Sequence, residues 1–382
     1  MSLRLLVAVA ALMAAGPVLA QEAPPELRER PDIAAGAAQF VKPTNAERTE
    51  VLVGFLTRLG FTPDVQAFEG GNDRTGPMEG ANVVVTVGEG ERDIVLTAHY
   101  DAVKLRDGTL SQGIVDNVGS VMAMMEAAKI LEMGLEGQPV GHRFVFVFTD
   151  QEELGLLGAK AFLESHDKDR IAAVINADVA AYGRTVMYGE NNGDQSDFVL
   201  ETLRALCAER GFDCMGYPVY PPSDDRAFSA AGVPVVSLGV QDAIGAHQMW
   251  LAFNGGEDNG LREGFVPPVF QRIHSAEDRI ERLNGQDVAR FGLFVADLAL
   301  KLDARLAEMA PPPETEPAAD AVLTPARLGV RVGGRADGHF LASTPVGGLV
   351  AGGCAGGEEH RDQGAPHAVL RGPGTNAFVR AT

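Results

Sequence analysis

The chain has 382 residues, of which 46% are hydrophobic and 22% are charged, and its formal net charge is -20. This composition predicts a packed core and excludes global disorder. The acidity argues against nucleic acid and anionic membranes as partners, and it suits cationic ligands such as metal ions or peptide ammonium groups. An acidic surface that only keeps the protein soluble is the alternative interpretation.

The first twenty residues predict an export signal. Arg4 precedes an apolar stretch at 5–15, a Gly-Pro pair interrupts that stretch, and Val18-Leu19-Ala20 offers small residues for cleavage. The stretch is short for a membrane span. We therefore expect a signal peptide at 1–20 that is cleaved after Ala20, and an exported, periplasmic or secreted protein without a stable membrane anchor. An uncleaved anchor is the alternative.

Helices and strands alternate along the next 290 or so residues. The patterns predict helices at 45–59, 118–133, 154–165, 198–210 and 287–306, and strands at 81–87, 93–98, 143–149, 171–177 and 233–240. We expect the strands at 81–87 and 93–98 to be neighbours joined by the turn at 88–91. The alternation predicts an α/β fold, with a mostly parallel central sheet flanked by helices.

The C-terminal part differs in composition. The Pro-rich residues 311–327 predict a stiff, extended linker. In the tail at 328–382, Leu328-Gly329-Val330 and the stretch 337–348 resemble the first strands of a PDZ domain, but the tail is too short for a whole one. We expect a truncated PDZ-like or disordered tail, with disorder at 352–382.

The chain contains three cysteines, which are too few for a disulfide scaffold. In an oxidising compartment Cys207 and Cys214 could pair, because a helix end and a turn are expected between them, and Cys354 would be left over. Three free thiols are the alternative.

Acidic residues and histidines cluster next to the predicted strand and helix ends. They are His99, Asp101, Asp116, Glu152, Glu153 and Asp178, with His274 in a later loop. Sites in such sheets lie beyond the carboxyl ends of the strands. Singly, such residues are ordinary turn, cap or surface residues. Together, two histidines and three carboxylates suit two Zn²⁺ ions with one bridging carboxylate. Because i and i+2 share a face of a strand, Asp101 could orient the His99 ring.

These residues lie in motifs that resemble the M28 family of metallopeptidases. The motifs are Ala98-His99-Tyr100-Asp101, 113–117, 152–158, Asn176-Ala177-Asp178, Ser223-Asp224 with Phe228, and His274 with Asp278. The resemblance runs from about residue 45 to 306. It implies a zinc-exopeptidase-like α/β/α sandwich, with a peptidase domain at 21–310.

The resemblance also implies a role for each residue. His99, Asp116 and Asp178 would hold one zinc, and Asp116, Glu153 and His274 the other, so that Asp116 bridges two Zn²⁺ per chain. Glu152 would be the general base for a water that bridges the metals, and Asp101 would support His99. Tyr220 would assist the oxyanion, with Tyr217 as its competitor. The implied activity is an aminopeptidase that removes N-terminal residues from peptide substrates.

Two features depart from the family pattern. Asp225 stands where the family often has His, and this leaves the nearby substrate contacts open. The apolar, Gly-rich segment 243–270, with Trp250 and Phe253, is an insertion that we expect to shape the mouth of the pocket. An ordinary surface loop is the alternative.

Three other functions are compatible with the same fold. A glutaminyl-cyclase-like acyltransferase would use a single zinc and would not need His99 as a ligand, so the intact His99 and Asp101 favour the peptidase. A carboxypeptidase or dipeptidase would need an arginine for the substrate carboxylate, and Arg226 is the candidate. A non-catalytic binding protein would have no need of Glu152 as a free base.

Overall fold

The computed structural model describes residues 32–135 and 140–310, together with the backbone of strands within 331–380. The chain divides into two compact units, Met1–Met309 and Ala310–Thr382. The predicted signal peptide at 1–20 and the linker at 311–327 lie outside the described residues, and they stay predictions. In the described part, no helix has both the length and the apolar character that a membrane span requires.

The first unit is built on an eight-stranded sheet in the order β1-β2-β4-β3-β5-β8-β6-β7. The strands are β1 (Asp64–Asn72), β2 (Gly76–Val87), β3 (Arg92–His99), β4 (His142–Thr149), β5 (Ile171–Ala177), β6 (Thr185–Gly189), β7 (Cys214–Tyr217) and β8 (Val235–Gln241). The central strands β4, β3, β5 and β8 are parallel, whereas β1–β2, β2–β4 and β6–β8 pair antiparallel. The expected α/β sheet is present, as a mixed sheet with a parallel centre.

The expected pairing of β2 with β3 is wrong, because β4 lies between them. Phe148 of β4 pairs with Val83 on one side and with Ala98 on the other. The Phe and Val side chains of β4 are apolar on both faces, so a central position buries both of them. The short segment 88–91 therefore crosses one intervening strand, about 10 Å from β2 to β3.

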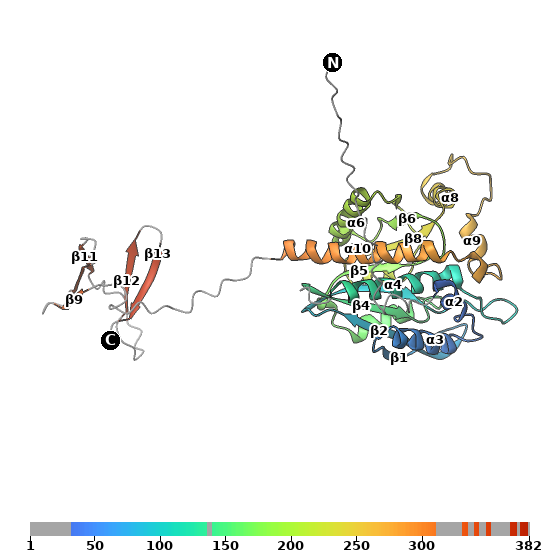
Figure 1. Ribbon diagram of the computed structural model, residues 1–382. Coiled ribbons are helices and arrows are strands. Elements are labelled where there is room, and N and C mark those ends of the chain that lie inside the picture. Colours follow the sequence, from blue (N-terminus) through green and yellow to red (C-terminus); the bar gives the residue numbers. More distant parts are fainter. Residues whose placement is uncertain are drawn as a thin grey trace, which may run out of the picture. The chain divides into compact units, whose positions relative to one another are not determined.

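Helices cover both faces of the sheet. They are α2 (Ile33–Ala38), α3 (Asn45–Arg58), α4 (Gly119–Gly134), α5 (Leu157–Ser165), α6 (Asp197–Arg210), α7 (Asp225–Ala230), α8 (Ala243–Asn254), α9 (Pro268–Arg272) and α10 (Gly285–Met309). Successive side chains of β3 point to opposite faces of the sheet, so the core has two parts. Ile94 and Leu96 belong to the part that contains residues of α3, α4, α6 and α10. Val95 belongs to the part that contains residues of α5 and α7. The long α10, orange in Figure 1, lies alongside α4 and α6.

Helix α3 begins with a reciprocal cap. The Thr44 hydroxyl oxygen accepts the Glu47 N–H at 3.2 Å, and the same hydroxyl donates to the Glu47 carboxylate at 2.7 Å. Leu52 and Phe55 on one face of the helix are buried against the sheet. The same face carries Arg48, one turn before Leu52, so the fold draws this arginine inside with its apolar neighbours.

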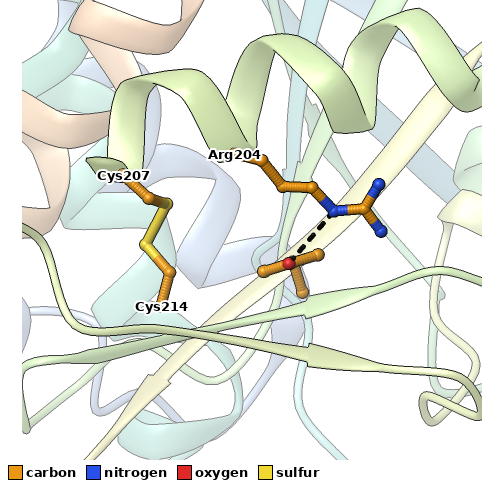
Figure 2. Close-up of a disulfide and its surroundings, with 4 residues drawn as sticks. Arg204, Cys207 and Cys214 are labelled. Carbon is orange, nitrogen blue, oxygen red and sulfur yellow. Dashed lines mark hydrogen bonds between the residues drawn. A yellow bond between two sulfur atoms is a disulfide. The ribbon is translucent and has the colours of Figure 1, made fainter. Parts of the chain in front are cut away.

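A disulfide joins Cys207, near the end of α6, to Cys214 at the start of β7 (Figure 2). Gly211 ends the helix in the left-handed conformation, with φ +64°, and this reverses the chain so that the two sulfurs meet. The sequence left open whether Cys207 and Cys214 pair or remain free thiols, and in the structure they are paired.

In its described residues, the second unit has two small antiparallel sheets. In the first, β10 (Phe340–Ser343) lies between β9 (Arg331–Gly334) and β11 (Leu349–Gly352). In the second, β12 (His367–Gly372) pairs with β13 (Thr375–Arg380). These last two strands lie where the sequence predicts disorder, which is a departure from that expectation. The PDZ-like character of the tail stays a prediction.

Candidate metal centre

Three parallel strands end at one edge of the sheet, and each delivers a candidate residue there. His99 is the last residue of β3, Asp178 directly follows β5, and the loop after β4 carries Glu152 and Glu153. Because β4, β3 and β5 are parallel neighbours, their carboxyl ends meet at this edge. Asp116 enters from the turn Ile114–Val118, which precedes α4, and His274 follows α9.

The first group of donor atoms consists of His99, Asp116 and Asp178. The Nε2 atom of His99 lies 3.1 Å from Oδ1 of Asp116 and 3.7 Å from Oδ1 of Asp178. The three donor atoms all lie within 4.8 Å of one another, a spacing that one ion can span.

The second group consists of Asp116, Glu153 and His274. The Nε2 atom of His274 lies 3.1 Å from Oδ2 of Asp116 and 3.0 Å from Oε2 of Glu153. Asp116 therefore belongs to both groups and turns one oxygen to each histidine. All five residues predicted as metal ligands converge on this one place.

Several buried donor atoms in these groups lack hydrogen bonds. Within the described chain, Nε2 of His99, Oε1 of Glu153 and Oδ1 of Asp178 are buried without a hydrogen-bond partner. Leaving such atoms unsatisfied costs about 1–3 kcal/mol each, and more when they are charged. A bound cation would satisfy them, and imidazole nitrogen with carboxylate oxygen is the donor set that zinc prefers. The residues present therefore fit the implied metal.

The electrostatics of the centre favour positive charge. Hydrogen bonds to Asp116 and then Glu153 raise the pKa of His274 to about 11. Burial, followed by the nearby charge of Asp116, raises the pKa of Glu153 to about 7. The nearby carboxylates favour a proton on the His274 imidazole, and for the same reason they favour a divalent cation in the place of that proton.

Asp101 supports the centre from behind. Its carboxylate lies 3.2 Å from Nδ1 of His99 and accepts the backbone N–H groups of Glu152 at 3.1 Å and Glu153 at 3.3 Å. This contact orients the His99 ring so that Nε2 faces the donor group. It also couples the end of β3 to the loop after β4. The predicted support of His99 by Asp101 is present in the geometry.

Two further residues hold the turn that carries Asp116, and no separate role was predicted for either of them. Asp278 accepts the N–H groups of Ile114, Val115 and Asp116 at 2.9, 2.6 and 3.2 Å. The Asn117 side chain donates to the Ala177 carbonyl at 2.9 Å and accepts the Val179 N–H at 3.0 Å. Asp278 and Asn117 lie inside the sequence motifs, and this could have indicated their role, since motif residues that are not ligands often orient ligands.

Backbone strain gathers at the same place. His274 has φ +57°, Gln151 next to Glu152 has φ +57°, and Val179 next to Asp178 has φ +62°. None is glycine, and for a β-branched residue such as Val179 this conformation is unusual. Strain of this kind costs on the order of 1–3 kcal/mol per residue and persists where surrounding contacts impose it.

The centre opens into a cavity of about 290 Å³. One wall of the cavity is acidic and consists of Asp116, Glu152, Glu153 and Asp178, next to His274. The rest of the lining is mainly apolar: Val179, Met187, Tyr220, Pro221, Pro222, Gln241, Met249, Val269, Phe270 and Ile273. The two candidate tyrosines lie differently with respect to the cavity. Tyr220 lines it, whereas the Tyr217 hydroxyl is buried and donates to the Ala246 carbonyl at 2.6 Å.

The segment 243–270 forms α8 and reaches into α9, and part of it shapes the cavity as expected. Met249 and Phe270 lie in the lining. Trp250 instead donates its ring N–H to the Gly216 carbonyl at 3.0 Å, and Phe253 packs on Phe270 with ring centroids 5.7 Å apart. The alternative of an ordinary surface loop is therefore wrong.

Arg226 and Asp225 lie away from the cavity lining. The Arg226 guanidinium donates to the Asn191 carbonyl at 2.8 Å and to the Tyr220 carbonyl at 3.3 Å. The Asp225 side chain is buried and accepts the Ser223 N–H at 2.9 Å. Both side chains are engaged in holding the loop before α7.

The fold is shared with zinc exopeptidases. Similar solved structures include a Zn-dependent exopeptidase from Parabacteroides distasonis (TM-score 0.55, 16% identity, 70% of this chain and 97% of that one). The LapA aminopeptidase of Legionella pneumophila has a TM-score of 0.53 at 17% identity, over 71% of this chain and 70% of that one. Glutaminyl cyclase of Porphyromonas gingivalis has a TM-score of 0.53 at 14% identity, over 70% of this chain and 96% of that one. At these identities the likeness concerns the fold alone.

Residues 82–299 match the model of peptidase family M28, and the chain belongs to that family. Among curated proteins, aminopeptidase YwaD of Bacillus subtilis is 29% identical over 148 residues, which is 37% of this chain. A vacuolar membrane protease of Yarrowia lipolytica is 31% identical over 117 residues, which is 29% of this chain. The matches span only 30% and 11% of the length of those relatives.

Proposed function

We propose that the protein is a metallo-aminopeptidase that binds two Zn²⁺ per chain and removes N-terminal residues from peptides. The observation that carries the proposal is the pair of donor groups sharing Asp116, with Glu152 beside them in the wall of the same cavity. In this proposal His99, Asp116 and Asp178 hold one ion, and Asp116, Glu153 and His274 hold the other. Zinc, when bound, supplies a Lewis acid that activates water and polarises the scissile carbonyl.

Glu152 is the proposed general base. It belongs to neither donor group, yet it lines the cavity next to both of them. In the metal-free protein, burial raises the pKa of Glu152 well above its ordinary value, so the carboxylate there holds a proton more strongly than an exposed one does. It takes a proton from the attacking water and delivers that proton to the amine that leaves.

Tyr220 is the proposed donor to the oxyanion. Burial raises the pKa of Tyr220 well above its ordinary value, so the hydroxyl keeps its proton and remains available to donate. A donor at the developing negative charge stabilises the transition state more than the ground state.

The cavity favours an N-terminal residue over a C-terminal one. Among the described residues, its lining contains no lysine or arginine that could bind the carboxylate of a C-terminal residue. Arg226, the candidate for binding such a carboxylate, donates to backbone carbonyls instead. The carboxypeptidase alternative therefore loses its candidate residue. The apolar remainder of the lining suits an apolar first side chain.

The fold does not distinguish a peptidase from a glutaminyl cyclase, so the arrangement of the metal-donor groups has to distinguish them. A single-zinc site has no need of His99 as a ligand, yet here His99 faces Asp116 and Asp178 and is oriented by Asp101. This arrangement favours two ions and therefore the peptidase.

Export is part of the proposal. The signal-like residues 1–20 motivate it, and the Cys207–Cys214 disulfide supports it, since such bonds persist mainly in oxidising compartments. The boundaries of the peptidase domain at 21–310, and of the linker and PDZ-like tail beyond it, are proposed on sequence alone.

The test compares two adjacent glutamates. Zinc content and hydrolysis of a panel of aminoacyl-p-nitroanilides would be measured for wild type, Glu152→Gln and Glu153→Gln. We expect two zinc ions in wild type, an activity loss of about 10²–10⁴-fold with zinc retained in Glu152→Gln, and loss of zinc in Glu153→Gln. One zinc or none in wild type, with no cleavage of any aminoacyl substrate, would refute the proposal.

A further inference from the structure

Arg48 on helix α3 is a fully buried arginine that the proposed mechanism does not use. Its side chain is 0% exposed. Arginine is almost never buried completely unless it is paired, yet no carboxylate of the described chain forms an ion pair with it. The guanidinium instead donates from Nε to the Tyr100 carbonyl at 2.6 Å and from Nη1 to the Gln112 carbonyl at 3.0 Å. Its remaining nitrogen, Nη2, is buried without a hydrogen bond.

The two carbonyls belong to the two loops that carry metal-binding side chains. Tyr100 lies between His99 and Asp101, and Gln112 lies two residues before the turn Ile114–Val118 that carries Asp116. One rigid, planar group thus joins the end of β3 to the segment before α4.

The second loop is packed tightly against the guanidinium at Gly113. Gly113 has φ +58°, and a Cβ there would lie 3.2 Å from Nη1 of Arg48 and 2.7 Å from Cβ of Ala102. Only glycine fits both the conformation and the space.

The charge of Arg48 lies among the carboxylates that support the centre. Burial lowers the pKa of Arg48 to about 10, while the charges of Asp101 and Asp278 oppose that effect, so the group is cationic at neutral pH. Asp101 orients His99, and Asp278 accepts three N–H groups of the Asp116 turn. A buried cation that attracts two buried carboxylates offsets part of the cost of burying them.

Neighbours of Arg48 on α3 fasten the same loop. The Asn45 side chain accepts the Ala102 N–H at 3.1 Å, and the Thr49 hydroxyl lies 2.7 Å from the Tyr100 hydroxyl. Positions 45, 48 and 49 share one face of the helix. They all precede residues 82–299, the part that matches the family, so this support comes from outside the matched region.

We propose that Arg48 is a positioning residue of the metal centre: it holds the loops of His99–Asp101 and Gly113–Asp116 in register, and its charge balances Asp101 and Asp278. Arg48 thereby sets the affinity for zinc without touching the metal. The inference rests on the proposed function in that zinc is taken as the bound ion.

The test measures zinc dissociation constants, by competition with a chromogenic chelator, and the melting temperature of the metal-free protein. The variants are Arg48→Met, Arg48→Lys and the control Arg58→Met. Arg58 lies on the same helix but is exposed, with its guanidinium carbon 4.4 Å from the Phe55 ring centroid. We expect Arg48→Met to weaken zinc binding by about 10–100-fold, as loss of an orienting partner does elsewhere. Arg48→Lys keeps the charge but not the two-pronged geometry, so it should recover part of the affinity.

Arg58→Met should bind zinc as wild type does. If Arg48→Met lowers the melting temperature but leaves both zinc constants unchanged, Arg48 is only structural and the inference is wrong. If Arg48→Met does not fold, Arg48→Lys decides, and an unchanged zinc affinity in that variant refutes the inference. Wild-type protein that binds no zinc would overturn the proposed function together with this inference, whereas the other negative results overturn the inference alone.

Discussion

The Oδ1 atom of Asp101 lies 3.2 Å from Nδ1 of His99, while the other ring nitrogen of that histidine faces Asp116 at 3.1 Å. The first contact fixes which nitrogen points to the metal site, and the second places that nitrogen in a donor group. Because the same carboxylate also accepts the N–H groups of Glu152 and Glu153, one side chain aligns a ligand from each group and the proposed base.

Replacing Asp101 with asparagine should therefore weaken both metal sites. An amide offers one acceptor oxygen where the carboxylate offers two, and its NH₂ group would face N–H donors. We expect zinc affinity and kcat/KM each to fall by about 10–100-fold. Chelator competition and steady-state kinetics measure these changes. The control is Asp107→Asn, the same substitution at an exposed turn, and an Asp101→Asn variant that behaves like it would contradict the assignment.

Tyr220 and Tyr217 should respond differently to loss of the hydroxyl. Tyr220→Phe removes the proposed oxyanion donor, so kcat should fall by about 10²-fold with little change in KM. Tyr217→Phe removes one buried hydrogen bond to the Ala246 carbonyl, so it should cost about 1 kcal/mol of stability and leave kcat unchanged. Kinetics together with urea unfolding separate the two results. The reverse pattern would make Tyr217 the catalytic tyrosine.

Asp93, at the opposite end of β3 from His99, should make stability depend on pH. Its buried carboxylate accepts Nε of Arg143 at 2.7 Å and lies 2.8 Å from Nε2 of His166. Burial alone would raise the pKa of Asp93, but the hydrogen bonds with Arg143 and His166 outweigh it and lower the pKa. A lowered folded-state pKa gives a contribution that is complete above the unfolded value, about 3.9, and is lost as pH falls through the folded value.

Asp93→Asn should therefore destabilise the protein by about 2 kcal/mol at neutral pH. The difference from wild type should shrink below about pH 4. Melting temperatures measured from pH 3 to 7 test this, with Asp73→Asn at an exposed turn as the control. A destabilisation that stays constant across that range would show that the charge of Asp93 is not the cause.

The disulfide should stabilise the fold without contributing to catalysis. In Figure 2 the two sulfurs join the end of α6 to the strand beyond the turn, and Arg204 lies one turn earlier on that helix. Cys207 and Cys214 are 7 residues apart. Closing a loop of this length lowers the entropy of the unfolded chain, which stabilises the folded state by about 2.5 kcal/mol. Reduction should lower the melting temperature, while the double variant Cys207→Ser, Cys214→Ser should melt at one temperature with or without reductant. A reductant-sensitive double variant would implicate another thiol.

Much of the site was predictable because its residues are tied to element ends. His99, Glu152, Glu153 and Asp178 follow apolar strands, and parallel strands bring such residues to one edge whatever the details of packing. The set of two imidazoles and three carboxylates already specifies a metal-binding chemistry. The disulfide and the pairing of β2 were not decided by pattern, because both depend on which segments become neighbours in space.

The sequence by itself determined the α/β alternation, because periodicity is a local property, and its resemblance to the M28 motifs named the five candidate donor residues and the proposed base. Only the tertiary structure decided that β4 separates β2 from β3, that Tyr220 rather than Tyr217 lines the cavity, and that Arg226 is engaged elsewhere. It also decided the place of Arg48. A charged residue on the apolar face of α3 is visible in the sequence, but the carbonyls it binds are 52 and 64 positions away, and long-range packing alone brings them together.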